Sequence, residues 1–384
     1  MRTLALTIAG ALLVAGSPAR AGGHHHRPVT ATTETPALFD DEAGGDADAD
    51  DPAIWVHPRD RARSLVIGTA KNGGLRVYDL AGQELQSIPT GDGGRFNNVD
   101  VTRGNLVVVT DRGRDQLRFY RIDPRTLRLR DVTAADPPLL FSRNQDEVEG
   151  QATGYGLATY GNLAVVSRRH TTRLGFFEIR DRGGRVSYVR RETLDLPRTF
   201  TLRDGSSWTP CADPGEDPQV EGMVIDAETH VLYAGQEDVG LWRIDLRTKK
   251  KRVIEHVTEF GAPYNADCTI TGPGEGGRIH ADVEGATIYE NYVLVSGQGD
   301  SRFFVYDRRT NAPVTTFTVS DGPRIDGVQH SDGAAATSTA LPGYPRGLLV
   351  LHDGENTPDE GRVSTNFKYV DWRRLALPRW TSSW

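Results

Sequence analysis

The stretch Leu65-Val66-Ile67, followed after a short polar turn by Leu75-Arg76-Val77-Tyr78-Asp79-Leu80, carries the pattern that decides the fold. An apolar strand is followed by a strand that contains an aromatic residue, and this pair recurs along the chain. The recurring aromatic residues lie 42 to 65 positions apart and are Tyr78, Tyr120, Phe177, Trp242, Tyr306 and Tyr369. Apolar and aromatic runs separated by turn residues predict short β-strands.

Six units of this length, each with about four short strands, are typical of propeller blades, which close into a ring and so remove exposed sheet edges. A β-helix would need shorter repeats, and a sandwich would not repeat six times. The 42 glycines and 21 prolines agree with many tight turns between strands. The sequence therefore predicts an all-β, six-bladed β-propeller with mostly four-stranded blades, as a single domain over residues 45–384.

The first residues have the layout of a secretory signal peptide. Arg2 precedes an apolar run from Leu4 to Val14, and the small-residue site Ala19-Arg20-Ala21 follows. The run is too short to span a bilayer, so a membrane anchor is the weaker alternative. We expect residues 1–21 to be a signal peptide of a secreted protein, and residues 22–44, with His24-His25-His26, to be a flexible lead-in.

Charge and cysteine content limit the function. The formal net charge of −7 argues against nucleic-acid binding, and an anionic substrate would need locally recruited cations. Cys211 and Cys268 are the only cysteines, and in an exported chain a pair favours a disulfide over two free thiols. We expect a monomer with a small-molecule substrate and no membrane or nucleic-acid partner.

Acidic residues recur at positions where propeller blades meet. The run Asp46-Ala47-Asp48-Ala49-Asp50-Asp51 resembles the start of an EF-hand loop, but Asp51 and His57 replace the glycine and glutamate that the loop requires. Alternate carboxylates of an extended chain could instead bind a hard cation, although Asp46 and Asp48 also fit a solvated lead-in.

Equivalent blade positions converge on the channel, which predicts a calcium site containing Glu221, Asp282 and Glu284.

Cationic residues follow apolar strands at a similar offset: Lys71, Arg112 and the run Arg168-Arg169-His170. The shared offset predicts that they lie on one rim, where guanidinium and ammonium groups would bind phosphate oxygens. For each residue taken alone, a surface salt bridge is the alternative.

Several motifs together resemble the β-propeller phytases, which are alkaline, calcium-dependent bacterial enzymes. The similarity runs through Asp48-Ala49-Asp50-Asp51-Pro52-Ala53-Ile54-Trp55, Asn97-Asn98-Val99-Asp100-Val101, Val220-Glu221-Gly222-Met223, Asp282-Val283-Glu284-Gly285, Ser296-Gly297-Gln298-Gly299, Asp321-Gly322-Pro323 and Asp353-Gly354-Glu355-Asn356. It ends near Asn366-Phe367-Lys368. The paired lysines of the family appear here as Lys71-Asn72, and its lysine in the third blade matches Arg169.

The resemblance implies a set of functional residues. The catalytic calcium ligands would be Tyr155, Glu221, Asp282, Glu284 and Gln298, and a stabilising calcium site would contain Asp51, Pro52, Val99 and Asn356. The phosphate contacts would be Lys71, Arg112 and Arg169, with Tyr155 and Glu237 also at the site.

The resulting hypothesis is the hydrolysis of phytate by calcium-activated water that attacks phosphorus directly. Glu221 or Glu237 would orient the water, while the cationic residues stabilise charge on the phosphoryl group. A propeller lactonase or phosphotriesterase is an alternative that would need an apolar pocket. A non-catalytic binding propeller with structural calcium is another.

Overall fold

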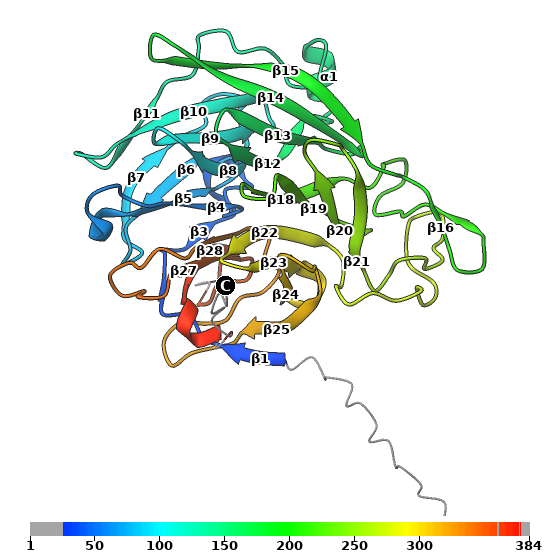
Figure 1. The fold of residues 1–384 in the computed structure, drawn as a ribbon. Helices are drawn as coiled ribbons and strands as arrows, with labels where there is room; N and C mark the ends of the chain where they lie inside the picture. Colours follow the sequence, from blue (N-terminus) through cyan, green and yellow to red (C-terminus); the bar gives the residue numbers. More distant parts are fainter. Residues whose placement is uncertain (1–25, 359–360, 376, 378–384) are drawn as a thin grey trace, which may run out of the picture.

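The computed structural model describes residues 26–358, 361–375 and 377, and its strands form six sheets arranged as the blades of a propeller (Figure 1). The all-β six-bladed prediction is confirmed. The signal peptide predicted for residues 1–21 lies outside the described residues. Among the described residues, no helix is long and apolar enough to cross a membrane.

The first three blades each contain four antiparallel strands in chain order. Blade one contains β4 (Pro52–Trp55), β5 (Leu65–Thr69), β6 (Leu75–Tyr78) and β7 (Glu84–Ile88). Blade two contains β8 (Phe96–Thr102), β9 (Leu106–Asp111), β10 (Gln116–Asp123) and β11 (Arg128–Asp131). Blade three contains β12 (Gly154–Tyr160), β13 (Leu163–Arg168), β14 (Arg173–Arg182) and β15 (Arg185–Asp195).

The next two blades repeat this arrangement, and the last one is completed from the N-terminal region. Blade four contains β18 (Val220–Asp226), β19 (Val231–Gln236), β20 (Gly240–Asp245) and β21 (Lys251–His256). Blade five contains β22 (Val283–Tyr289), β23 (Tyr292–Gly297), β24 (Arg302–Asp307) and β25 (Pro313–Val319). Blade six contains β26 (Ala334–Thr337), β27 (Leu348–Asp353) and β28 (Ser364–Asp371), with the N-terminal strand β2 (Thr33–Glu34) as its fourth.

A flexible lead-in is predicted for residues 22–44, but the described part of this segment, residues 26–44, contains three short strands. The strand β1 (His26–Val29) pairs in parallel with β25, while β2 and β3 (Leu38–Phe39) pair with β28. A short 3₁₀ turn at Glu42–Gly44 leads into blade one. These strands complete backbone hydrogen bonds at the edges of blades five and six, which the local composition of the segment does not reveal.

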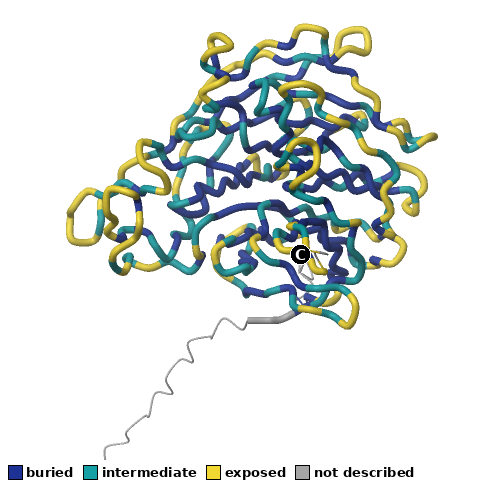
Figure 2. The backbone as a smooth tube through the Cα atoms, turned by 180° about the vertical axis from the view of Figure 1, so that it is seen from behind, coloured by how far each residue is buried: buried dark blue, intermediate teal, exposed yellow. Residues whose placement is uncertain are grey.

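Apolar residues pack between neighbouring blades. The second strands β5, β9, β19, β23 and β27 are buried at every position, whereas the outer strands β7 and β11 are largely accessible. Buried backbone fills the interior of the molecule, and exposed loops lie at its periphery (Figure 2). All six recurring aromatic residues predicted from the sequence are buried. The repeat in the sequence therefore reflects the same packing in every blade, because each sheet buries both faces against its neighbours.

The remaining elements lie in the connections. A small hairpin of β16 (Phe200–Thr201) and β17 (Ser207–Trp208) projects between blades three and four, and the helix α1 (Gln145–Glu149) precedes blade three (Figure 1). Further 3₁₀ turns cover Arg61–Arg63, Gln298–Asp300 and Trp372–Leu375. The connection after β17 continues to the edge of the central channel.

Candidate functional site

Each blade contributes one residue from the start of its innermost strand, or from just before it, to a single cavity of about 380 Å³, termed here the upper cavity. In four of these strands the pairing register shifts at this residue, which marks a β-bulge. A bulge redirects a side chain out of the regular alternation of a strand. The six residues are Asp50, Asn97, Tyr155, Glu221, Glu284 and Asp332.

Four of these six residues are followed by a glycine, for a steric reason. A Cβ atom on Gly156 would lie 2.0 Å from the carbonyl oxygen of Glu221, and one on Gly222 would lie 2.1 Å from that of Glu284. Only glycine permits such close approach of adjacent inner strands. The pairs Tyr155-Gly156, Glu221-Gly222, Glu284-Gly285 and Asp332-Gly333 therefore share one blade position. This pattern is the sequence signal that could have identified Asp332.

A second set of residues follows the second strand of blades one to five and gives the upper cavity a cationic side and an acidic side. Blades one to three supply Lys71, Arg112 and Arg169, and blades four and five supply Glu237 and Gln298. The structure thus brings together the cationic residues that the sequence places on one rim. It also brings Asp282 and Glu284 beside Glu221, as the blade positions predict.

The acidic side of the upper cavity is deeply buried. Glu221, Glu237 and Glu284 are at most 5% exposed, and each offers a carboxylate oxygen within 4.8 Å of the others. Burial is the largest cause that raises the pKa of all three carboxyls. Repulsion from neighbouring acids raises these pKa values further, chiefly from Asp332 for Glu221 and from Asp282 for Glu237. Burial, and then the charge on Glu221, raises the pKa of Asp282 to about 6.

The oxygen atoms on the acidic side of the cavity are suitable ligands for a hard cation. Among the described residues, Glu237 Oε1 and Glu284 Oε2 are buried without a hydrogen-bond partner. Ten acidic and four basic side chains line the upper cavity, so negative charge is in excess. Calcium prefers clustered carboxylate and amide oxygens of this kind. The arrangement therefore suits one or more metal ions that prefer oxygen ligands.

Contacts between blades fix the orientation of the central carboxylate. Glu221 Oε1 accepts a hydrogen bond of 2.6 Å from Asn97 Nδ2, and Glu221 Oε2 accepts one of 2.6 Å from the Tyr155 hydroxyl. Arg112 donates through Nη1 to Asn97 Oδ1 at 3.0 Å. The cationic and acidic sides of the cavity are thus connected through the side chain of Asn97.

Lys71 is held by carboxylates of blades one and six. Its Nζ lies 2.6 Å from Asp48 Oδ2 and 3.8 Å from Asp332 Oδ2. Although burial lowers the pKa of Lys71, the charges of Asp50, Asp332 and Asp48 outweigh this effect and raise it. The ammonium group therefore stays charged at neutral and alkaline pH.

Arg95 is a cationic residue of the upper cavity that the sequence does not single out. Its Nη1 lies 2.9 Å from Asp46 and donates a hydrogen bond of 3.3 Å to Asn72 Oδ1. Asp48 is therefore a partly buried partner of Lys71, whereas Asp46 pairs with Arg95 but stays exposed to solvent, as the solvated lead-in predicts. Asn72 itself does not line the cavity.

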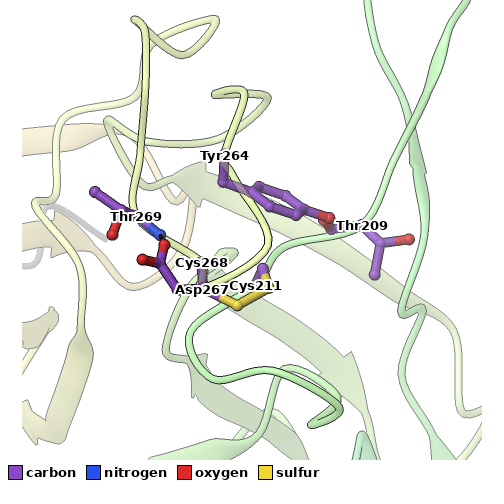
Figure 3. Close-up of a disulfide and its surroundings, with 6 residues drawn as sticks. All are labelled: Thr209, Cys211, Tyr264, Asp267, Cys268 and Thr269. Atoms are coloured by element: carbon purple, nitrogen blue, oxygen red, sulfur yellow. Dashed lines mark hydrogen bonds between the residues drawn. A yellow bond between two sulfur atoms is a disulfide. The ribbon is translucent and has the colours of Figure 1, made fainter.

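The connection between β17 and β18 forms one wall of the upper cavity. Ala212, Asp213, Glu216, Asp217 and Gln219 line it. The structure joins Cys211 to Cys268 in a disulfide, which links this connection to the one after β21 (Figure 3). Close to the disulfide, the Tyr264 hydroxyl donates to the carbonyl of Thr209 at 2.6 Å (Figure 3).

A second cavity of about 180 Å³, termed the channel cavity, lies between all six inner strands. Asp51, Pro52 and Val99 line it, and the Val99 amide donates to Asp51 Oδ2 at 3.0 Å. Burial raises the pKa of Asp51 well above its ordinary value.

Asn356, which the resemblance groups with these three residues, does not line the channel cavity. Its side chain bonds to Ser364 and Asn366 instead, and it accepts a hydrogen bond of 3.1 Å from Lys368 Nζ. Asn356 follows β27 in blade six, whereas Pro52 and Val99 lie on the inner strands of blades one and two and Asp51 immediately precedes the first of these strands.

The sequence is similar to one protein family over most of its length. A family model described as Phytase matches residues 2–194 and 215–378. A curated 3-phytase of Bacillus subtilis (strain 168) is 32% identical over 400 residues, which cover 98% of this chain and 93% of the relative.

The solved structures that match this chain are far more distant in sequence. A calcium-binding protein, regucalcin, of Agrobacterium tumefaciens is 10% identical with a TM-score of 0.49, over 90% of this chain and 96% of its own. A chain of the mitotic checkpoint complex is 12% identical with a TM-score of 0.46, over 95% of this chain and 86% of its own.

Proposed function

Because the chain belongs to the phytase family, we propose that it hydrolyses phytate to lower inositol phosphates and inorganic phosphate, with calcium as its cofactor. The observation that carries the proposal is the division of the upper cavity into a cationic side and a buried acidic side. Phytate carries many phosphate groups on one small ring, so adjacent phosphates can contact both sides at once.

The acidic side would hold calcium through Glu221, Asp282, Glu284, Gln298 and Tyr155, which all line the upper cavity. Bound calcium would neutralise phosphate oxygens and make a nearby water molecule more acidic. Among the described residues, the buried Glu284 Oε2 has no hydrogen-bond partner, which supports this assignment. We propose a separate structural calcium at Asp51, Pro52 and Val99.

The protein groups would then orient and polarise the reactants. Lys71, Arg112 and Arg169 would bind the phosphate oxygens and stabilise negative charge in the transition state. Glu221 or Glu237 would accept a hydrogen bond from the attacking water and direct it at phosphorus. Since Asn97 and Tyr155 already fix both oxygens of Glu221, Glu237 Oε1 is the carboxylate oxygen better placed for that task.

We further propose that the protein is secreted and acts as a monomer. The predicted signal peptide of residues 1–21 and the Cys211–Cys268 disulfide support an oxidising, extracellular environment. An apolar substrate pocket, as a lactonase would need, is not supported, because charged and polar side chains dominate the lining of the upper cavity.

A phosphate-release assay tests the proposal. With phytate and calcium, the protein should release phosphate; a calcium chelator should abolish the release, and added calcium should restore it. Glu221→Gln should remove the activity, while Glu149→Gln, at an exposed position of α1, should retain it. Phytate binding without phosphate release would establish a non-catalytic propeller, and chelator-resistant release would refute the role of calcium.

A further inference from the structure

Gln219 connects the two sides of the upper cavity through its side-chain amide. Its Nε2 donates a hydrogen bond of 2.8 Å to Glu237 Oε2, and its Oε1 accepts one of 2.9 Å from the backbone amide of His170. Gln219 itself lines the cavity, immediately before β18. One neutral side chain thus contacts both the acidic side and the turn that carries Arg169.

The first of these contacts determines which oxygen of Glu237 is free. Glu237 is 5% exposed, and its backbone amide also donates to the carbonyl of Gln219 at 3.1 Å. With Oε2 bonded to Gln219, Oε1 is the oxygen without a hydrogen-bond partner among the described residues. The amide of Gln219 therefore sets the rotation of the Glu237 carboxylate and leaves Oε1 available for reactants.

The second contact holds the turn after β13. His170 has a φ of 58°, in the left-handed region that costs energy for a residue other than glycine. The His170 amide donates to Gln219, and the His170 carbonyl accepts a hydrogen bond of 3.3 Å from the Asp217 amide. The imidazole ring of His170 also contacts Glu216. The segment 216–219 thus fixes the strained turn, and with it the neighbouring Arg169, whose buried Nε has no hydrogen-bond partner among the described residues.

We propose that Gln219 is a positioning residue that sets both the Glu237 carboxylate and the Arg169 guanidinium for the reaction. The inference rests on the proposed function, because it assigns Glu237 to water orientation and Arg169 to phosphate binding. An amide is required at this position, since it donates and accepts without carrying charge. A carboxylate could not donate to Glu237, and an ammonium group could not accept from His170.

Gln219→Met tests the proposal, because methionine has a similar length but neither hydrogen-bonding group. We expect kcat for phytate to fall about tenfold, as Glu237 loses its orientation, and KM to rise severalfold, as the Arg169 turn loosens. Gln116→Met is the matched control: its amide donates to the carbonyl of Pro137 at 3.1 Å in blade two, outside the upper cavity, and its kinetics should match the parent.

Double-mutant cycles distinguish positioning from a structural role. In a Glu237→Gln background, Gln219→Met should leave kcat nearly unchanged, and in an Arg169→Ala background it should leave KM nearly unchanged. Additive effects in both cycles would overturn the proposal. A lower melting temperature with unaltered kcat and KM would also overturn it.

A failure of the proposed function has a different signature, namely no phosphate release by the parent protein. In that case calorimetry with inorganic phosphate still tests the Arg169 contact. Gln219→Met should weaken phosphate binding severalfold in the parent but not in Arg169→Ala. Equal weakening in both backgrounds would refute the inference.

Discussion

The Tyr155 hydroxyl donates a hydrogen bond of 2.6 Å to Glu221 Oε2, although the two residues lie 66 positions apart in the sequence. Tyr155 belongs to β12 of blade three and Glu221 to β18 of blade four. Burial, and then the charge of Glu221, raises the pKa of Tyr155 well above its ordinary value, so its hydroxyl remains protonated and able to donate. The contact fixes the carboxylate at the centre of the acidic side before any ligand arrives.

Tyr155→Phe is therefore expected to weaken the site without unfolding the protein. The buried Glu221 carboxylate loses one of its two hydrogen-bond donors, which costs about 1–3 kcal/mol. We expect a tenfold or greater loss of phytate hydrolysis at limiting calcium, with partial recovery at high calcium. Tyr160→Phe, on the exposed end of the same strand, is the control in a calcium titration of activity. Equal activity of both variants would contradict the prediction.

Arg95→Gln is expected to raise KM for phytate. The change removes a charge-assisted contact of about 1.5–3 kcal/mol from the cationic side, which corresponds to roughly tenfold or more in KM. Steady-state kinetics with Arg103→Gln, an exposed arginine outside the upper cavity, as the control would check this. If both substitutions leave KM unchanged, Arg95 serves only as the partner of Asp46.

The stability of the calcium-free protein should fall as pH rises. Burial raises the pKa of Asp282 to about 6 and that of Asp238 to about 7, from ordinary values of 3.8. The folded state therefore keeps protons that the unfolded state releases between about pH 4 and 7, and ionisation in this range favours unfolding.

Calcium should oppose this loss, since it binds the ionised carboxylates. The difference in melting temperature with and without calcium should thus widen from pH 5 to pH 8 in scanning calorimetry. Asp282→Asn should reduce the widening. A difference that is constant across this range would contradict the link between these carboxyls and calcium.

The disulfide should stabilise the wall of the upper cavity. It closes a separation of 57 residues, for which the chain-entropy model gives a stabilisation of about 4 kcal/mol. We expect Cys211→Ser with Cys268→Ser to lower the melting temperature and to raise KM, because Asp213 and Glu216 lie on the freed connection. A reductant should lower the melting temperature of the parent protein towards that of the variant and leave the variant unaffected.

Lys368 should be essential for closing the ring. Its side chain is fully buried, and its Nζ bonds to Glu34 of β2 and to Asp326, with Asp353 Oδ2 at 3.3 Å. Lys368→Met would leave three carboxylates without their cation, at a cost of about 3–5 kcal/mol. Urea unfolding would measure this, with Lys250→Met at an exposed position as the control. A loss no larger than that of the control would show that the ammonium is dispensable.

The sequence by itself determined the blade architecture and the positions of several residues around the upper cavity. The strand and aromatic pattern around Tyr78 repeats because each blade buries the same faces, so it is visible without coordinates. Lys71, Arg112 and Arg169 were predictable for the same reason: a fixed offset from a strand becomes a fixed place on the rim of a propeller.

Only the tertiary structure decided the features that do not repeat from blade to blade. Gln219 and Arg95 reach the upper cavity from connections of individual length and shape. Glu34 meets Lys368 only because the N-terminal strand completes the last blade. Such contacts depend on how the chain closes on itself, and residues hundreds of positions apart leave no local pattern that records their contact.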